Sequence, residues 1–224
     1  MGLLNINFNF YNNNKYSLNE LSNEEIEKAK KNVKLVIVDD EEVPNMENLK
    51  NDDYNIKILS DIDNIQDFVT KDYKVVILDI QGIGKKITKR SEGWGVLEYL
   101  KKEYPHIVII VFTGADWSIT KYKDKADLAD FIIGKDSEYL NFKMKIDAAI
   151  RKSLSIEFHL KVLKKRLNDG ENNKEEIESL IKKYGKNKEK VEKKLKKISS
   201  SEKTIQKVDN TLSIISSIYS ITSL

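Results

Sequence analysis

The sequence predicts an α/β fold built on a parallel sheet, and two observations indicate it. Short apolar segments recur through the middle of the chain, at residues 33–38, 54–59, 74–80, 106–112 and 131–133. The stretches between them carry apolar residues at helical spacing or leave room for a short helix. Because five strands alternate with helices, we expect a parallel sheet with right-handed crossovers.

Residues 74–80, Lys-Val-Val-Ile-Leu-Asp-Ile, are predicted to form the centre of this sheet. Such a run of large apolar residues is typical of a strand that is covered on both faces. Asp79 comes at the carboxyl end of the strand. In open α/β sheets ligands bind at that edge, so the position of Asp79 suggests a chemical role.

Local signals mark some of the predicted helices. Ser22 and Glu25 have the spacing of a capping box, which predicts a helix over 22–32. Pro44 suits the first turn of a short helix within 44–52. The remaining helices are expected over residues 62–71, 93–102, 116–127 and 138–167, the last of them long.

The charge distribution divides the 224 residues into parts. Residues 151–224 carry eighteen Lys and Arg against ten Asp and Glu, a net charge of +8. The first 150 residues carry twenty-one against twenty-six, a net charge of −5. An acidic body with a basic tail indicates parts with different partners. We predict an N-terminal extension over 1–32, a sheet domain over 33–150 and a helical output or dimerisation region over 151–224.

Composition excludes several classes of site. The chain has no cysteine, which excludes disulfides, thiol catalysis and zinc–thiolate sites and fits a reducing, cytoplasmic location. The N-terminus lacks a basic region followed by an apolar run, so we expect no signal peptide. The longest uncharged stretch, residues 210–224, is shorter than the about 20 apolar residues of a spanning helix. We expect no membrane span.

The N-terminal segment leaves two interpretations open. Leu4, Ile6, Phe8 and Phe10 alternate with asparagines, which is the periodicity of a strand. The segment could add an edge strand to the sheet, or it could be a disordered leader.

The C-terminal tail has the pattern of helices that pair. Apolar residues recur at steps of three and four, which predicts a helical hairpin or coiled coil, closed within one chain or by dimerisation. These residues are Ile177, Leu180, Ile181, Tyr184, Val191, Leu195, Ile198, Ile205, Val208, Leu212, Ile215 and Tyr219. Lysines between 182 and 197 could contact nucleic acid, although no helix-turn-helix or zinc pattern accompanies them. The alternative is the solvated face of a partner-binding element.

Polar residues follow the predicted strands at the points where the strands end. Asp39 and Asp40 follow the first strand, Asp79 ends the third, Thr113 ends the fourth and Lys135 follows the fifth. In a parallel sheet these ends lie along one edge, so three carboxylates, a hydroxyl and an ammonium are expected to converge. Clustered carboxylates repel each other unless a cation lies among them, and Mg²⁺ prefers such oxygen ligands.

The segments Val-Asp39-Asp40, Leu-Asp79-Ile, Phe-Thr113-Gly-Ala and Gly-Lys135 together resemble the receiver domain of bacterial response regulators, over residues 33–150. The resemblance implies a flavodoxin-like fold with strand order 2-1-3-4-5. It implies that Asp79 accepts a phosphoryl group, and that Thr113 and Lys135 contact phosphoryl oxygens. It further implies a Mg²⁺ site formed by Asp39, Asp40, Asp79 and the carbonyl of Gln81.

General chemistry agrees with that interpretation. Carboxylates serve as nucleophiles that form aspartyl phosphates. Phosphoryl transfer mostly requires positioning and charge neutralisation, which Mg²⁺ and a lysine supply. The alternative is structural: Asp39 and Asp40 would cap a helix, Asp79 would be a solvated strand end and Lys135 a surface charge.

The sequence departs from the receiver pattern in three places. Residues 81–90 form a longer segment after Asp79 than receivers usually have. Asp136, rather than proline, follows Lys135. Ile132 replaces the usual aromatic residue, and Phe131, one position away, is expected on the opposite face of its strand. These departures put the usual aromatic switch in doubt.

We therefore expect a phosphoacceptor signalling protein rather than a turnover enzyme. A histidine kinase or phosphotransfer protein would phosphorylate Asp79 with Mg²⁺ as cofactor, and the C-terminal helices would carry the output. One alternative is a scaffold or adaptor that keeps the receiver fold but works without phosphorylation. A further alternative is nucleic-acid binding by the basic tail.

Overall fold

A computed structural model describes residues 21–114, 121–166 and 202–222, with isolated helical positions at 176, 179, 190, 193, 194 and 197. The chain divides into two compact units. One unit, Ser22–Leu154, contains the sheet, and the other contains the C-terminal helices from Ser155 onward. The segment through Leu4 and Phe10, which the sequence leaves open between an edge strand and a disordered leader, lies outside the described residues.

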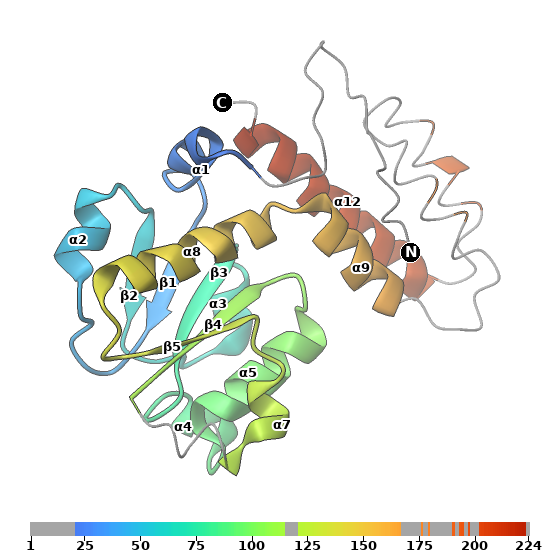
Figure 1. Ribbon diagram of the computed structural model, residues 1–224. Coiled ribbons are helices and arrows are strands. Elements are labelled where there is room, and N and C mark those ends of the chain that lie inside the picture. The colour runs from blue at the N-terminus through green and yellow to red at the C-terminus, as the bar shows by residue number, and fades with distance from the viewer. Residues whose placement is uncertain are drawn as a thin grey trace, which may run out of the picture. The chain divides into compact units, whose positions relative to one another are not determined.

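The sheet unit is built on five parallel strands (Figure 1). Their order, β2-β1-β3-β4-β5, is the order of flavodoxin-like sheets and confirms the predicted fold. Neighbouring strands pair in parallel throughout, with Asp79 opposite Phe112 and Thr113 opposite Gly134. The strands are β1 (Leu35–Val38), β2 (Ile56–Leu59), β3 (Val75–Asp79), β4 (Val108–Thr113) and β5 (Phe131–Gly134).

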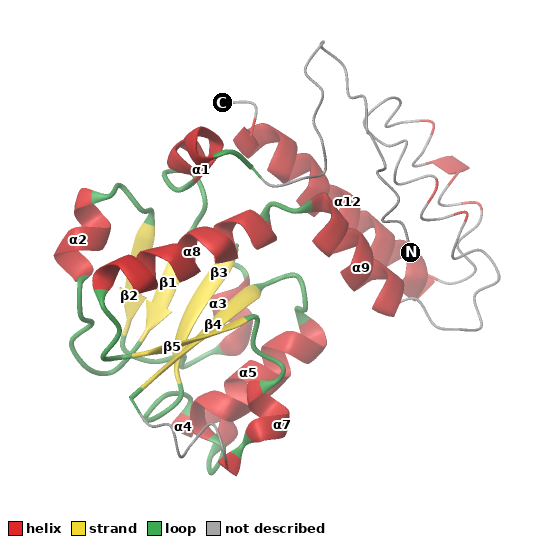
Figure 2. Cartoon of the chain, viewed as in Figure 1, coloured by secondary structure: helices red, strands yellow, loops and turns green. Residues whose placement is uncertain are grey.

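Helices cover both faces of the sheet (Figure 2). One face carries α1 (Asn23–Ala29), α2 (Met46–Asn51) and α8 (Tyr139–Ser153). The other carries α3 (Ile65–Val69), α5 (Glu92–Glu103) and α7 (Lys123–Ala126), and a short helix α4 (Lys85–Thr88) precedes α5. The capping box of Ser22 and Glu25 is formed at the start of α1, as predicted.

The strand pattern explains this two-sided packing. Side chains alternate along β3, so Val76 and Leu78 pack with Phe68 of α3 and Leu97 of α5 in one hydrophobic core. Val75 and Ile77 are completely buried on the opposite face, which α8 covers. Because β3 is buried on both faces, its only polar residue, Asp79, falls where the strand ends.

The predicted long helix over 138–167 is wrong, because the chain breaks it into α8 and α9 (Ile156–Arg166). The Ser153 hydroxyl donates to the Ile150 carbonyl, and Leu154 ends α8. The Ser155 hydroxyl then accepts the N–H of Phe158 at the start of α9. Serine side chains compete in this way for backbone groups of a continuous helix.

Other helices also differ from their predicted bounds, among them α2 and α7. Pro44 precedes the first turn of α2 rather than lying in it, because Asn45 is the N-cap. Within the predicted helix over 116–127, the structure describes α7 from Lys123, while residues 115–120 lie outside the described residues.

In the C-terminal unit, α9 packs along α12 (Glu202–Thr222). Val208, Leu212 and Ile215 of α12 are buried, as their spacing of four and three predicts. The predicted stripes between 177 and 198 lie outside the residues whose side chains are described. Of the lysines between 182 and 197, Lys190, Lys193, Lys194 and Lys197 are described, and they are exposed. None of the described helices is long and apolar enough to cross a membrane.

Candidate functional site

The structure brings the predicted polar residues together at the carboxyl edge of the sheet. Asp39 follows β1, Asp79 ends β3 and Lys135 follows β5. Oxygen atoms of Asp39, Asp40 and Asp79 all lie within 4.8 Å of one another. We refer to Asp39, Asp40, Asp79 and Lys135 as the carboxyl-edge cluster.

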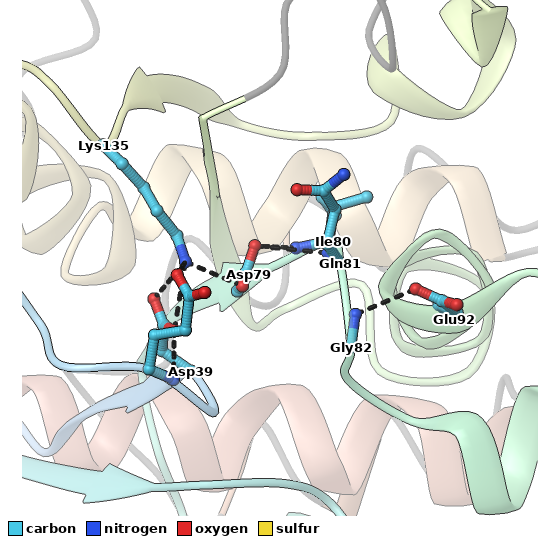
Figure 3. A network of polar contacts seen from close by, with 8 residues as sticks. Asp39, Asp79, Ile80, Gln81, Gly82, Glu92 and Lys135 are labelled. Carbon is cyan, nitrogen blue, oxygen red and sulfur yellow. Dashed lines mark hydrogen bonds and ion pairs between the residues drawn. The ribbon is translucent and has the colours of Figure 1, made fainter.

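Lys135 links Asp39 and Asp79 of this cluster (Figure 3). Its Nζ lies 2.9 Å from Oδ2 of Asp79, 3.1 Å from Oδ1 of Asp39 and 3.3 Å from Oε2 of Glu41. The main-chain N–H of Lys135 donates to the Thr113 carbonyl at 3.0 Å, which extends the pairing of β5 with β4. This bond fixes the backbone from which the ammonium reaches the carboxylates.

Asp79 is buried, and its two oxygens have different partners. Oδ1 accepts the main-chain N–H groups of Ile80 at 2.6 Å and Gln81 at 3.2 Å, whereas Oδ2 faces Lys135. Burial raises the pKa of the Asp79 carboxyl above its usual value, and the nearby Asp39 adds to that effect. The hydrogen bonds from Lys135 and Gln81 oppose the rise in pKa without cancelling it.

Lys135 stays charged in this setting. Burial alone would lower the pKa of its ammonium, but the hydrogen bonds to Asp79 and Asp39 outweigh burial and raise that pKa. The site therefore holds one permanent positive charge against three clustered carboxylates.

Asp39 retains unused capacity to bind a cation. Its Oδ1 accepts the N–H of Glu41 at 2.9 Å. Its Oδ2 is buried and lies 3.0 Å from Nζ of Lys135, but it has no well-aligned hydrogen bond among the described residues. Since three carboxylates gather beside one ammonium, the donor set fits a hard divalent cation such as Mg²⁺.

Two glycines allow the backbone to approach the cluster closely. Gly82 has φ of +82°, and a Cβ there would collide with the carboxylate of Asp40. A Cβ on Gly93 would collide with the main chain of Asp79 and Ile80. The start of α5 therefore lies directly against the end of β3.

The long segment after Asp79 folds into a compact loop with a short helix of its own. The N–H of Gly84, just before α4, donates to Oδ1 of Asp61 at 2.6 Å. Lys86 of α4 pairs with Asp63 at 2.6 Å, and Ile83 is completely buried. Because α4 has only four residues, it shows no helical periodicity from which it could be predicted.

Sequence reasoning also missed Glu92, whose carboxylate accepts the N–H of Gly82 at 2.8 Å. The acidic residue stands at the start of a predicted helix, where it is ordinarily read as a favourable charge for the helix dipole. Only the folded loop brings it to a residue ten positions earlier.

The remaining predicted residues lie next to the cluster. Thr113 is buried at the end of β4, one residue after Phe112, which pairs with Asp79 in the sheet. Gln81 follows Asp79, with an exposed side chain. Phe131 lies near the ammonium groups of Lys145 and Lys152 of α8, while Ile132 packs into the core on the opposite face. These positions agree with the alternation expected for β5.

The structure is similar to solved receiver domains of response regulators over about half of the chain. The receiver domain of NtrX from Brucella abortus matches with a TM-score of 0.43 and 20% identity, covering 52% of this chain and 97% of that one. Response regulator TrrA from Thermotoga maritima, solved in complex with Mg²⁺ and BeF, matches with a TM-score of 0.42 and 24% identity. That match covers 52% of this chain and 98% of TrrA.

A longer NtrX structure, in complex with ATP, matches with a TM-score of 0.46 and 19% identity, and the match covers 67% of this chain. The chain spans about a third of that protein, since the match covers 34% of its length. Neither a family model nor a curated protein matches the sequence.

Proposed function

We propose that this chain is a response-regulator-like signalling protein in which Asp79 accepts a phosphoryl group from a histidine kinase or phosphotransfer protein. The observation that carries the proposal is the cluster itself. One lysine contacts both Asp79 and Asp39, while the oxygens of Asp39, Asp40 and Asp79 gather within 4.8 Å. A surface cluster of unrelated charges would not place a buried carboxylate, an ammonium and two further carboxylates at the end of a central strand.

The two oxygens of Asp79 have distinct roles in the proposed transfer. Oδ1 is held by the N–H groups of Ile80 and Gln81, so Oδ2 is the oxygen that attacks phosphorus. The new bond joins Oδ2 to phosphorus, the phosphorus–nitrogen bond of the donor histidine breaks, and its electron pair returns to the imidazole. Lys135 then pairs with a phosphoryl oxygen instead of Oδ2.

Mg²⁺ bound at this site would neutralise charge on the phosphoryl oxygens. Asp39, Asp40, Asp79 and the Gln81 carbonyl are the groups that would hold it. Thr113, at the end of β4, would donate its hydroxyl to a phosphoryl oxygen. These assignments rest on the resemblance of the strand-end residues to receiver domains and on the grouping of the carboxylates.

Mass spectrometry of the intact protein tests this function. Exposure to acetyl phosphate and Mg²⁺ should add one phosphoryl group to the wild-type chain and none to Asp79→Asn. A matched variant, Asp127→Asn, changes an exposed aspartate at the end of α7 and should be phosphorylated like the wild type. Phosphorylation that survives Asp79→Asn, or that never occurs, contradicts the proposal.

Output through the C-terminal helices is the second part of the proposal. Val208, Leu212 and Ile215 of α12 are buried, so this region forms a packed helical element. We propose that it carries the output by packing against a partner or a second copy of the chain. Light scattering with and without phosphodonor should show a change in assembly. The same samples in a gel-shift assay test the exposed basic positions of the tail for salt-dependent binding to nucleic acid.

A phosphorylation-independent scaffold is the alternative, and two observations favour it. The segment after Asp79 has its own helix, α4, bound to Asp61 and Asp63. Phe131 lies against α8 instead of facing the core on the other side. Assembly that is the same in wild type, in Asp79→Asn and with phosphodonor would support the scaffold.

A further inference from the structure

Glu92 forms a hydrogen bond that its place in the sequence does not explain. Its Oε2 accepts the main-chain N–H of Gly82 at 2.8 Å, across ten residues. Figure 3 shows Glu92 on one side of the Gln81–Gly82 segment and the carboxylates of Asp39 and Asp79 on the other. The bond therefore joins the start of α5 to the loop that passes the carboxyl-edge cluster.

The direction of this bond fixes the direction of a carbonyl. The N–H of Gly82 and the C=O of Gln81 belong to one peptide unit, which is planar and trans, as are the other described peptide bonds. In a trans peptide the N–H and the C=O point in opposite directions. Because Glu92 holds the N–H on its own side, the Gln81 carbonyl points away from Glu92, toward the side where the carboxylates lie.

We propose that Glu92 is a positioning residue that orients the Gln81 carbonyl as an oxygen ligand for a divalent cation at the carboxyl-edge cluster. The inference rests on the proposed function, since it concerns the same Mg²⁺ site. Glu92 does not touch the cation. It acts on the site through the peptide unit that it holds, as hydrogen-bonded partners of metal ligands commonly do.

Several contacts keep Glu92 in reach of Gly82. Gly93 allows α5 to lie against β3, and its N–H donates to the Ile80 carbonyl at 3.1 Å. The Thr88 hydroxyl donates to the Glu92 carbonyl at 2.9 Å. Glu92 itself has φ of +46°, a backbone conformation that costs energy in residues other than glycine. The fold thus holds Glu92 in a strained backbone conformation in which its carboxylate accepts the N–H of Gly82.

A simple helix-capping role does not account for this arrangement. An acidic residue that only stabilises a helix start faces the N–H groups of its own first turn. Here the carboxylate bonds to the loop, and the hydroxyl of Ser91, the N-cap of α5, donates back to the Thr88 carbonyl. The side chains of Ser91 and Glu92 therefore form hydrogen bonds with the preceding loop rather than with the first turn of α5.

Calorimetric titration of the full chain with MgCl₂ tests the inference. Glu92→Ala should weaken Mg²⁺ binding about 10-fold, the lower end of the loss seen when a partner of a metal ligand is removed. Glu92→Gln keeps an oxygen that accepts the Gly82 N–H, so its affinity should stay closer to wild type than to Glu92→Ala. Glu98→Ala removes another carboxylate of α5, one that pairs with Lys125, and should bind Mg²⁺ like the wild type.

The outcomes separate this inference from the proposed function. Wild type that binds Mg²⁺ and Glu92→Ala that binds it equally well overturn the role of Glu92 alone. Equal losses in Glu92→Gln and Glu92→Ala also overturn it, because charge rather than the hydrogen bond would then matter. A wild type that does not bind Mg²⁺ overturns both. Thermal unfolding with and without Mg²⁺ serves as a second measurement: the stabilisation that Mg²⁺ adds should shrink in Glu92→Ala, beyond any change in the metal-free protein.

Discussion

Two clusters of acidic and basic side chains in the sheet unit differ in the balance of their charges. In the α2–α8 cluster, Asp52 accepts hydrogen bonds from Lys143 and Tyr139, so one carboxylate meets one ammonium and one hydroxyl. In the carboxyl-edge cluster, the carboxylates of Asp39, Asp40 and Asp79 gather within 4.8 Å, and the single ammonium of Lys135 contacts Asp39 and Asp79. The charges of Asp52 and Lys143 balance each other, whereas the carboxyl-edge cluster has an excess of negative charge.

The pKa values of the two aspartates move in opposite directions for this reason. The hydrogen bonds from Lys143 and Tyr139 lower the pKa of Asp52 below its usual value, although partial burial opposes them. Burial raises the pKa of Asp79, and Asp39 raises it further. Ionised Asp52 therefore stabilises the fold, whereas ionised Asp79 destabilises it. An excess of buried carboxylates that costs stability is typical of a site kept for a ligand.

Removing the lysine of the carboxyl-edge cluster should lower the stability of the fold most. Lys135→Met keeps the apolar stem and leaves Asp39 and Asp79 buried without their counter-charge, so the free energy of unfolding should fall by about 3–5 kcal/mol. Urea denaturation measures the loss. Mg²⁺ should restore part of the lost free energy of unfolding, because a cation can replace the ammonium. A variant whose stability does not change with Mg²⁺ would contradict the comparison of the two clusters.

Asp52→Asn should have a smaller effect, a loss of about 1 kcal/mol at neutral pH, because Asp52 is only partly buried. Its lowered pKa sets the sign of the pH dependence. The contribution of Asp52 is fully present above its ordinary pKa of 3.8 and is lost as the pH falls through the lower value of the folded state. The difference in unfolding free energy between wild type and variant should therefore shrink in acid, and a difference that grows there would contradict it.

Asp79→Asn should change the stability of the fold least, and it should stabilise the fold where the other two substitutions destabilise it. Removing a charge that burial disfavours should raise the thermal midpoint of the Mg²⁺-free protein, whereas Asp52→Asn lowers it. Scanning calorimetry of the two variants, measured side by side without divalent cations, checks the contrast. If both substitutions lower the midpoint, the two clusters do not differ in the way described.

Much of this architecture was predictable because it depends on local pattern. Apolar runs locate the strands, and the residues that follow Val38, Leu78 and Phe112 must meet at one edge once the strands are parallel. Asp39, Asp79 and Lys135 could thus be brought together on the sequence alone. The capping box at Ser22 is equally local, since its two residues lie one helical turn apart.

What could not be predicted depends on contacts between distant residues or on competing local bonds. The hydrogen bond of Glu92 to Gly82 requires the fold of the loop between them. The cluster around Asp52 joins α2 to α8, which are separated by four strands in the chain. The break between α8 and α9 depends on the hydroxyls of Ser153 and Ser155, which helical periodicity of apolar residues does not register.

The two outermost strands, β2 and β5, are four residues long. An edge of that length offers few unpaired backbone groups to a strand of another molecule, and Lys57 in the middle of β2 is exposed and adds a charge that discourages such pairing. Aggregation by addition of a strand to the described five-stranded sheet is therefore disfavoured. Any ordered oligomer that it forms is expected to be held by helix side chains rather than by a continuous intermolecular sheet.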